Sequence, residues 1–586
     1  MSQVTISDPS HAMNQKRMLG HPIGLYILFF TELWERFSYY GMRAILVLFI
    51  VDNVASGGLG WTNAAALSLY GTYTMSVYLA SIPGGILADR LLGQKKTVML
   101  GGILLCIGHL ILAIPTLWAF YAGLGFIVAG VGGLKANIST MVGGLYKQGD
   151  PDRDRGFTVF YIGINIGAFL AGIIVASVAK IYGWHYGFGL AGLGMIVGQI
   201  VFVYGQKYLV GVGDYIKAEL ASDGKHEKPL TKIEKERIFV LLISFLIVIV
   251  FWGSFEQAGG LMNLYAQQKT DRFIDLFNFE IPAGWFQSVN SFFIITLGTA
   301  IASFWVLMRI REKEDSSIFK MALGTIIMAF GFLFMVFASL EAGAVPFGKA
   351  GMIWLILAYL FHTIGELCLS PVSLSFITKL APVKYASIMM GIYFAATGLG
   401  NKVAGIIGEA SQSEPVEVAF NSNSNLPTYV LDSIKNESPV VFQTVLTPNS
   451  TNFELLDYET KAPISQYFNI SEEERVEIIK VLTENNVTSE SPFHALISMD
   501  IPSDLSENLT KEDYKGSLVI DEIQNEREYN TFLAIMIFAT LFGAILILFL
   551  RPLKKLTHGA EAMHPEDESE HRAVDEGYSR RDEVVV

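Results

Sequence analysis

The chain has 586 residues, of which 52% are hydrophobic and 17% are charged, and its mean hydropathy is +0.42. This composition is too apolar for an ordinary soluble protein. The formal net charge of −13 describes one segment rather than the whole chain, because residues 413–528 contain 22 acidic and 7 basic residues and the remainder is slightly basic; we expect no nucleic-acid partner.

Apolar stretches of about 20 residues, the length that crosses a bilayer, recur along the chain. Twelve are centred near residues 37, 76, 107, 132, 169, 195, 249, 298, 328, 364, 398 and 540. They predict an all-α integral membrane protein with twelve transmembrane helices in two six-helix bundles, plus a small extracytoplasmic insert. The predicted parts are a cytoplasmic tail (1–21), an N-terminal bundle (22–206), a cytoplasmic connector (207–236), helices 7–11 of the C-terminal bundle (237–412), the acidic insert (413–528), helix 12 (529–551) and a disordered cytoplasmic tail (552–586).

Lysine and arginine are distributed unevenly between the loops that join these spans. The loops assigned to the inside contain twelve of them, and the loops assigned to the outside contain four. Because positive residues favour the cytoplasmic side, both termini are predicted to be cytoplasmic and the insert periplasmic or extracellular. The predicted location is the cell (inner) membrane.

The first predicted span carries four charges inside an apolar stretch. Six of its residues share one helical face, because residues three, four and seven apart stack together: Glu32, Glu35, Arg36, Tyr39, Tyr40 and Arg43. A charge at bilayer depth costs at least about 2.5–3.5 kcal/mol, so such residues usually line a bundle interior or a water-filled cavity. This face predicts a buried polar site in a protein that moves a solute.

Polar residues recur in later spans, namely Lys135 and Asn137, Tyr161 and Asn165, Trp252 and Glu256, Asn290, and His362, Glu366 and Ser370. Glu366 is the single carboxylate of the tenth span and is expected to be functional. Lys135 either enters the cavity or extends to the cytoplasmic edge, and His362 is expected to be an interior histidine. At the inner end of the second span, Asp89 and Arg90 predict a gate or structural latch.

The insert combines short β-like runs with one helical pattern near residues 471–484, so a small α+β domain is favoured over disorder. It contains five N-x-S/T triplets, which begin at Asn436, Asn449, Asn469, Asn486 and Asn508. These are either glycan acceptors or chance matches in a stretch rich in Asn, Ser and Thr. The ligand or partner of the insert is unknown.

Taken together, the segments resemble the proton-dependent oligopeptide transporter family of the major facilitator superfamily. The most specific motif is E-x-x-E-R-F-x-Y-Y-G at 32–41. Supporting motifs follow in family order: A-D-R-x-x-G-x-K-K, G-x-G-G-L-K-x-N-I-S, F-Y-x-x-I-N-x-G, F-W-x-x-x-E-Q and G-E-L-x-x-S-P-V. The resemblance covers residues 22–412 and the last span but not the insert, and it departs from the family at Tyr393, where Trp is common.

The resemblance implies a symporter that imports di- and tripeptides with protons by alternating access, without a cofactor. It assigns proton coupling to Glu32, Glu35, Glu256 and Glu366. It assigns substrate binding to Arg36, Tyr39, Tyr40, Arg43, Tyr78, Lys135, Asn165, Trp252, Asn290, Glu366 and Ser370. It assigns gating to Arg43 with Glu256 and to Asp89 with Arg90.

Three alternatives remain besides the peptide symporter. A carrier of the same fold could transport another small anion such as nitrate, although the intact E-x-x-E-R motif favours peptides. A drug/proton antiporter would leave Arg36 and Lys135 without a role. A sensor or adhesion protein could act through the insert. An enzyme is excluded by the lack of a nucleophile, metal or cofactor motif, since Cys106 and Cys368 both fall in predicted spans.

Overall fold

The computed structural model describes most of the helical part of the chain and one sheet before its last long helix. The described residues are 16–146, 150, 152–214, 230–344, 348–382, 385–412, 416–422, 440–446, 453–457, 468–469, 476, 492–499, 514–523 and 527–560. Apart from residue 476, the helix predicted at 471–484 lies outside them, as do the triplets at Asn436, Asn449, Asn486 and Asn508, residues 215–229 of the connector and residues 561–586 of the tail.

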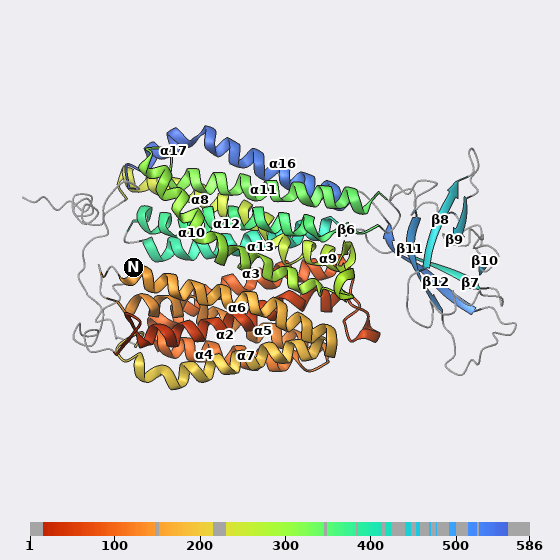
Figure 1. Ribbon diagram of the computed structural model, residues 1–586, viewed down its shortest axis with the longest axis horizontal. Helices are drawn as coiled ribbons and strands as arrows, with labels where there is room; N and C mark the ends of the chain where they lie inside the picture. Colours follow the sequence, from red (N-terminus) through yellow and green to blue (C-terminus); the bar gives the residue numbers. More distant parts are fainter. Residues whose placement is uncertain are drawn as a thin grey trace, which may run out of the picture.

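The helices form two bundles that are consecutive in the sequence. The first contains α2 (Ile23–Val51), α3 (Asn63–Leu87), α4 (Gln94–Leu112), α5 (Leu117–Gly144), α6 (Asp152–Tyr182) and α7 (Trp184–Gly205). The second contains α8 (Lys232–Phe255), α9 (Leu261–Gln268), α10 (Gln287–Ile310), α11 (Ser317–Ala342), α12 (Met352–Leu380), α13 (Ala386–Ala410) and α16 (Arg527–Leu548). Figure 1 shows the bundles side by side, with their helices along the long axis of the molecule.

Nine helical stretches within the described residues are long and apolar enough to cross a membrane. Helices α2, α3 and α13 are not among these nine. Helix α2 carries the four charges of the first predicted span, and the other two interrupt their apolar residues with Gly, Ser and Thr. The protein is therefore mostly helical with several membrane-spanning helices, and the total of twelve spans stays a prediction.

Helices α3 and α13 bring the two bundles into close contact. A Cβ atom on Gly71 of α3 would lie 2.6 Å from the Cα atom of Gly405 on α13. Glycine at both positions therefore lets the two backbones approach closely, as small residues do in membrane helix packing. This contact lies between the bundles and helps to position the polar residues described below.

Local sequence motifs fix where some of the helices begin and end. The capping box of Thr231 and Glu234 begins α8, because each side chain bonds the backbone N–H of the other residue. Gly93, with a φ of +76°, follows the π-helical turn η2 (Ala88–Leu92) at the end of α3.

The start of the predicted disordered tail is helical. Helix α17 (Leu550–Leu556) extends past the predicted boundary at residue 552, and Lys554 of this helix pairs with Glu314 at 3.1 Å.

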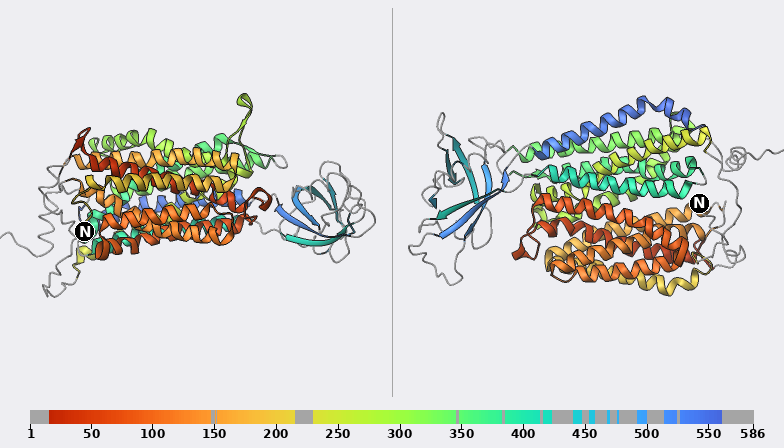
Figure 2. Two further views of the ribbon diagram at one scale, coloured as in Figure 1. Left: turned by 90° about the horizontal axis from the view of Figure 1, so that it is seen from below. Right: turned by 180° about the vertical axis from the view of Figure 1, so that it is seen from behind.

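The described part of the insert is a six-stranded sheet. Its strands are β7 (Val416–Ser422), β8 (Val440–Leu446), β9 (Phe453–Asp457), β10 (Phe468–Asn469), β11 (Pro492–Met499) and β12 (Tyr514–Ile523). They pair antiparallel in the order β10-β7-β12-β11-β8-β9. The two views of Figure 2 place the sheet beyond one end of the helices, which we call the sheet end.

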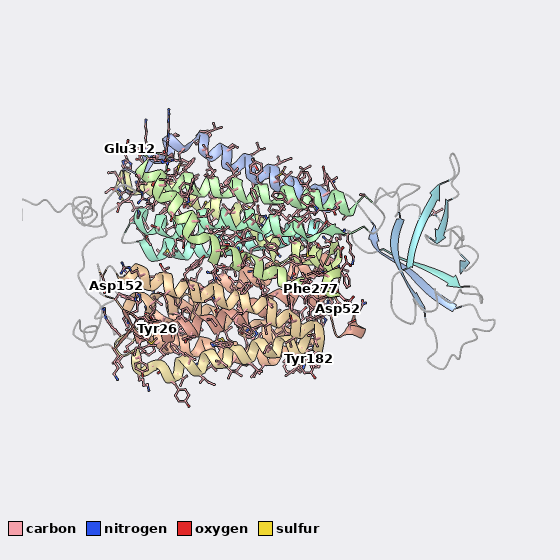
Figure 3. All side chains as sticks on the ribbon, viewed as in Figure 1. Tyr26, Asp52, Asp152, Tyr182, Phe277 and Glu312 are labelled. Atoms are coloured by element: carbon pink, nitrogen blue, oxygen red, sulfur yellow. The ribbon has the colours of Figure 1, made fainter. Side chains whose placement is uncertain are left out.

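The chain alternates between the two ends of the bundles as consecutive spanning helices require. Asp52, Tyr182 and Phe277 lie at the sheet end in Figure 3. Tyr26, Asp152 and Glu312 lie at the opposite end in the same view.

Candidate functional site between the helical bundles

A buried cluster of two acids and one base occupies the middle of α2. The Nε atom of Arg36 lies 2.9 Å from Oε1 of Glu32 and 2.6 Å from Oε2 of Glu35, and all three side chains are almost fully buried. Within the described residues, neither oxygen of Glu35 has a hydrogen-bond partner, and the same is true of Oε2 of Glu32 and Nη2 of Arg36. Buried polar atoms without hydrogen-bond partners are costly, so this cluster has capacity to bind another polar or charged group.

A second base lies on another helix of the same bundle. The ammonium of Lys135 on α5 stands 3.8 Å from the ring centroid of Tyr78 on α3, a cation–π contact. The ring of Tyr40 lies between two guanidinium groups, 6.0 Å from Cζ of Arg36 and 5.6 Å from Cζ of Arg43. Two tyrosine rings therefore contact the three positive charges of this region.

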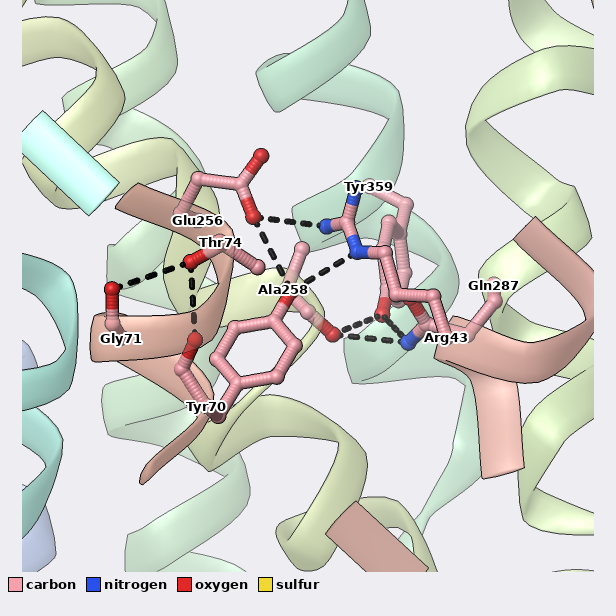
Figure 4. A network of polar contacts seen from close by, with 8 residues as sticks. All are labelled: Arg43, Tyr70, Gly71, Thr74, Glu256, Ala258, Gln287 and Tyr359. Carbon is pink, nitrogen blue, oxygen red and sulfur yellow. Dashed lines mark hydrogen bonds and ion pairs between the residues drawn. The ribbon is translucent and has the colours of Figure 1, made fainter. Parts of the chain in front are cut away.

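The two bundles are joined by a triangle of charged and phenolic groups (Figure 4). Nη2 of Arg43 on α2 lies 2.7 Å from Oε2 of Glu256, and its Nε donates to the hydroxyl of Tyr70 on α3 at 2.7 Å. The hydroxyl of Tyr70 donates in turn to the same carboxylate oxygen at 3.0 Å. The structure thus brings together Arg43 and Glu256, which sequence analysis had paired.

Glu256 occupies an interruption between two helices. The 3₁₀ turn η4 (Glu256–Ala258) separates α8 from α9 and directs the carboxylate toward the first bundle. Gly259 follows, and a Cβ atom there would lie only 1.9 Å from the hydroxyl of Tyr70. A glycine is therefore needed for Tyr70 to reach the ion pair.

A group of amide and hydroxyl contacts lies beside the triangle. Gln287 at the start of α10 donates to the carbonyl of Ala258 at 2.7 Å and to the hydroxyl of Tyr359 on α12 at 3.0 Å. The hydroxyl of Tyr359 also donates to the Ala258 carbonyl, at 3.1 Å. These bonds fix the end of η4 against α10 and α12 (Figure 4).

The second bundle presents an acidic site. Asn290 on α10 donates to Oε2 of Glu366 at 2.8 Å and to the hydroxyl of Thr363 at 3.1 Å, both on α12. The hydroxyl of Ser370 and the indole N–H of Trp252 are buried and have no hydrogen-bond partner within the described residues. Both could therefore bond to a bound solute.

The remaining predicted residues differ in their surroundings. Asn165 donates to the carbonyl of Tyr161 in its own helix, at 2.9 Å. Asp89 and Arg90 are exposed in the η2 turn at the opposite end of α3. His362 is fully buried and packs against aromatic rings, so its interior position agrees with the expectation from sequence.

Further polar contacts join the bundles toward the sheet end. Asn63 on α3 donates to the side-chain oxygens of Gln268 and Gln412, both at 3.2 Å. Lys402 on α13 donates to the hydroxyl of Thr72 on α3 at 2.8 Å. With the triangle and the contact between α3 and α13, these bonds connect the bundles in the half of the protein nearest the sheet.

Sequence reasoning missed several residues of this network, chiefly Tyr70, Gln287, Tyr359 and Lys402. The sequence does contain signals for two of them, Tyr70 and Lys402. Tyr70 shares the helical face of Tyr78, two turns away. Lys402 is a charge inside a predicted span, the signal that identified Lys135.

Comparison with known proteins places these features in a family. The sequence profile of the POT family (PTR2) matches residues 95–212 and 216–424. The peptide transporter YePEPT of Yersinia enterocolitica is 34% identical over 469 residues, which are 69% of this chain and 90% of the relative. A di-/tripeptide transporter of Lactococcus lactis is 33% identical over 441 residues, which are 65% of this chain and 88% of the relative.

Comparison of this fold with solved structures gives the same family. The crystal structure of a POT peptide transporter in complex with alafosfalin matches with a TM-score of 0.63 and 34% identity, over 68% of this chain and 90% of that structure. The chain therefore belongs to the POT family, whose members are transporters with a fold of the major facilitator type and not enzymes.

Proposed function

We propose that the protein is a proton-coupled symporter that imports di- and tripeptides by alternating access. The observation that carries this proposal is the separation of charge between the bundles: the first contributes Arg36 and Lys135, and the second contributes Glu366 with Asn290. A peptide is a dipole with a carboxylate at one end and an ammonium at the other. The relatives that are named peptide transporters support the same substrate class.

The two ends of the peptide have suitable partners in this arrangement. Arg36 and Lys135 would bind the peptide carboxylate, and Glu366, already bonded to Asn290, would receive the ammonium group. The unpartnered donor of Trp252 and the hydroxyl of Ser370 would bond the peptide backbone. The remaining predicted residues, Tyr39, Tyr40, Tyr78 and Asn165, would shape the pocket.

Proton coupling would follow from competition between the glutamates of this cluster and the peptide carboxylate for the guanidinium of Arg36. Two carboxylates, Glu32 and Glu35, contact the same Nε atom, so protonation of one would release part of the guanidinium for a peptide carboxylate. One proton moving down 100 mV supplies about 2.3 kcal/mol, enough for roughly 50-fold accumulation. The buried charge cluster thus provides a physical route from the proton gradient to peptide binding.

Alternating access would use the contacts between the bundles. The triangle of Arg43, Glu256 and Tyr70 would close the site toward the sheet end, and its rupture would open that side. Glu256 would also take part in proton coupling. At the other end, Asp89 and Arg90 would contribute to closure when the bundles rock.

The proposed topology assigns the sheet end to the outside. Twelve spans, cytoplasmic termini and a periplasmic or extracellular insert agree with the distribution of Lys and Arg in the loops. The protein would lie in the cell (inner) membrane, with peptide and protons entering from the side of the sheet.

Uptake of labelled dialanine into proteoliposomes tests this function. We expect accumulation with an inward proton gradient and only equilibration without one. Accumulation that ignores the gradient would contradict proton coupling. If the reconstituted protein neither binds nor carries dialanine, the assignment of peptides as substrates is wrong, and nitrate would be the next compound to test.

A further inference from the structure

A small hairpin at the sheet end exposes an unusual amount of apolar surface. It consists of β4 (Phe273–Ile274), the 3₁₀ turn η5 (Asp275–Phe277) and β5 (Phe279–Glu280), in the connection between α9 and α10. Leu276 is 84% exposed and Phe277 is 71% exposed, and two further aromatic rings, Phe273 and Phe279, are also exposed. Exposed apolar clusters of this kind mark contacts with a membrane or another protein.

The base of the hairpin is fixed to both bundles. Lys180, in the last turn of α6, donates to the carbonyl of Glu280 at 3.0 Å and to its carboxylate at 2.7 Å. Arg272 pairs with the carboxylate of Glu280 at 2.9 Å and donates to the carbonyl of Gln267 on α9, in the second bundle, at 3.3 Å. The hairpin is therefore held at a defined height along the helices.

That height corresponds to a membrane boundary. Lys180 is two residues from Tyr182, which ends α6, and Tyr182 and Tyr186 form an exposed aromatic pair with ring centroids 6.4 Å apart. Exposed tyrosines at the ends of spanning helices occupy the level of the lipid headgroups. Because Lys180 bonds Glu280, the hairpin begins at this level.

The hairpin also projects sideways from the helices. In the left-hand view of Figure 2 it is the yellow-green hairpin that projects from the side of the bundle, away from the helices. Figure 3 shows Phe277 at the sheet end, together with Asp52 and Tyr182. A segment that leaves a membrane protein sideways at the height of the aromatic residues meets the surrounding bilayer.

From this geometry we infer that the hairpin docks on the lipid leaflet at the sheet end, with Phe273, Leu276 and Phe277 immersed in the boundary between headgroups and acyl chains. Aromatic and branched apolar side chains suit this layer, because it accepts apolar groups while the polar backbone stays near water. The contact would anchor the connection between α9 and α10 to the membrane. This inference requires only that the helices span the bilayer and is independent of the substrate.

Spin labels on the full-length protein test the docking. In a background with Cys106→Ser and Cys368→Ala, a nitroxide at Phe277→Cys is compared in proteoliposomes with one at Ser56→Cys. Ser56 is exposed in the loop between α2 and α3, at the same end of the helices, and serves as the matched control. Collision rates with oxygen, which concentrates in lipid, and with a water-soluble nickel complex are measured for both sites.

We expect the label at 277 to be reached by oxygen in preference to nickel and to lie about 5–10 Å below the phosphates, whereas the label at 56 should be reached by nickel. Nickel access at 277 equal to that at 56 would show that the tip is in water and would overturn the inference. Low collision rates with both reagents would show a protein cover, from a second copy or the insert, and would also overturn it. Leu276→Cys repeats the measurement if Phe277→Cys does not retain the unfolding temperature of its background.

Discussion

The position of Arg36 is unfavourable for the stability of the folded protein. It faces two carboxylates, and oxygens of both remain unpaired in a buried site within the described structure. Removing charges from water costs several kcal/mol per ion, and incomplete pairing does not recover that cost. The sequence could predict these charges, because any ion inside an apolar span is conspicuous. It could not predict which oxygens stay unpaired, since that depends on neighbouring helices.

Glu366→Gln should weaken dialanine binding by about 10–100-fold, because a hydrogen bond to a charged group contributes about 1.5–3 kcal/mol. Asn290 can still donate to the amide oxygen of the new side chain, so we expect little loss of stability. Calorimetric titration measures the affinity. Glu341→Gln is the control: Glu341 accepts a hydrogen bond from Trp354 outside the site. Equal affinities in the two variants would exclude Glu366 as the ammonium partner.

Tyr70→Phe should weaken closure at the sheet end. The change removes two hydrogen bonds of the triangle, each contributing about 1 kcal/mol, so we expect a longer-distance population between spin labels at Val54→Cys and Leu340→Cys. Both positions are exposed toward the sheet end of their helices. Tyr73→Phe is the matched control, because the buried hydroxyl of Tyr73 has no hydrogen-bond partner in the described residues. Identical distance distributions in the two variants would contradict the gate.

At the scale of elements, the structure adds to the sequence expectation where one helix stops and another begins. The sequence predicts a seventh span centred near residue 249, and the structure shows that its helix α8 stops at Phe255 and that the turn η4 leads into the short helix α9. The pair Gly259–Gly260 is a turn signal in the sequence, but the close approach of Tyr70 to Gly259 from another helix is not predictable from it. The paired glycines of α3 and α13 are similar: each is visible in the sequence, but their contact is not.

Gly71→Ala should destabilise the protein by about 1–3 kcal/mol, because the added methyl group would force α3 and α13 apart. Gly85→Ala on the same helix is the control, since a Cβ atom there would meet nothing within 4 Å. Thermal unfolding in detergent and dialanine uptake measure the effect. If both variants unfold at the same temperature, the close contact does not contribute to stability.

The contact between α6 and the hairpin should depend on pH. A hydrogen bond from Lys180, aided by Arg272 and Lys349, lowers the pKa of Glu280 below its ordinary value of 4.5, against the opposing effect of burial. A lowered pKa means that the ion pair contributes fully above the ordinary value and is lost as the pH falls through the lowered one.

Spin labels at Tyr182→Cys and Phe277→Cys should therefore keep one distance from pH 7.5 down to the ordinary carboxyl pKa of 4.5 and broaden only below it. With Glu280→Gln added, we expect a broad distribution at every pH. A distance that changes between pH 7 and 5 in the unmodified hairpin would show that another group controls the contact.

At the scale of the whole molecule, hydropathy alone predicts two helical bundles and an interrupting insert, because burial in lipid needs long apolar runs. The β-like runs of the insert were also visible, and β8 occupies one of them. The order of its strands was not predictable: β7 pairs with β12, which lies almost a hundred residues later in the chain. Pairing over that separation is decided by three-dimensional packing, as are the contacts that join the bundles.

The most direct test of the proposed mechanism is to measure proton movement during peptide uptake. Proteoliposomes containing a pH-sensitive dye receive dialanine under an inside-negative potential, with wild type and Glu32→Gln in parallel. We expect lumenal acidification in wild type and none in the variant, because the amide oxygen of the new side chain can still accept the hydrogen bond of Arg36 but cannot carry the proton. Peptide uptake by wild type without acidification, or equal acidification in the variant, would contradict the assignment of proton coupling to this cluster.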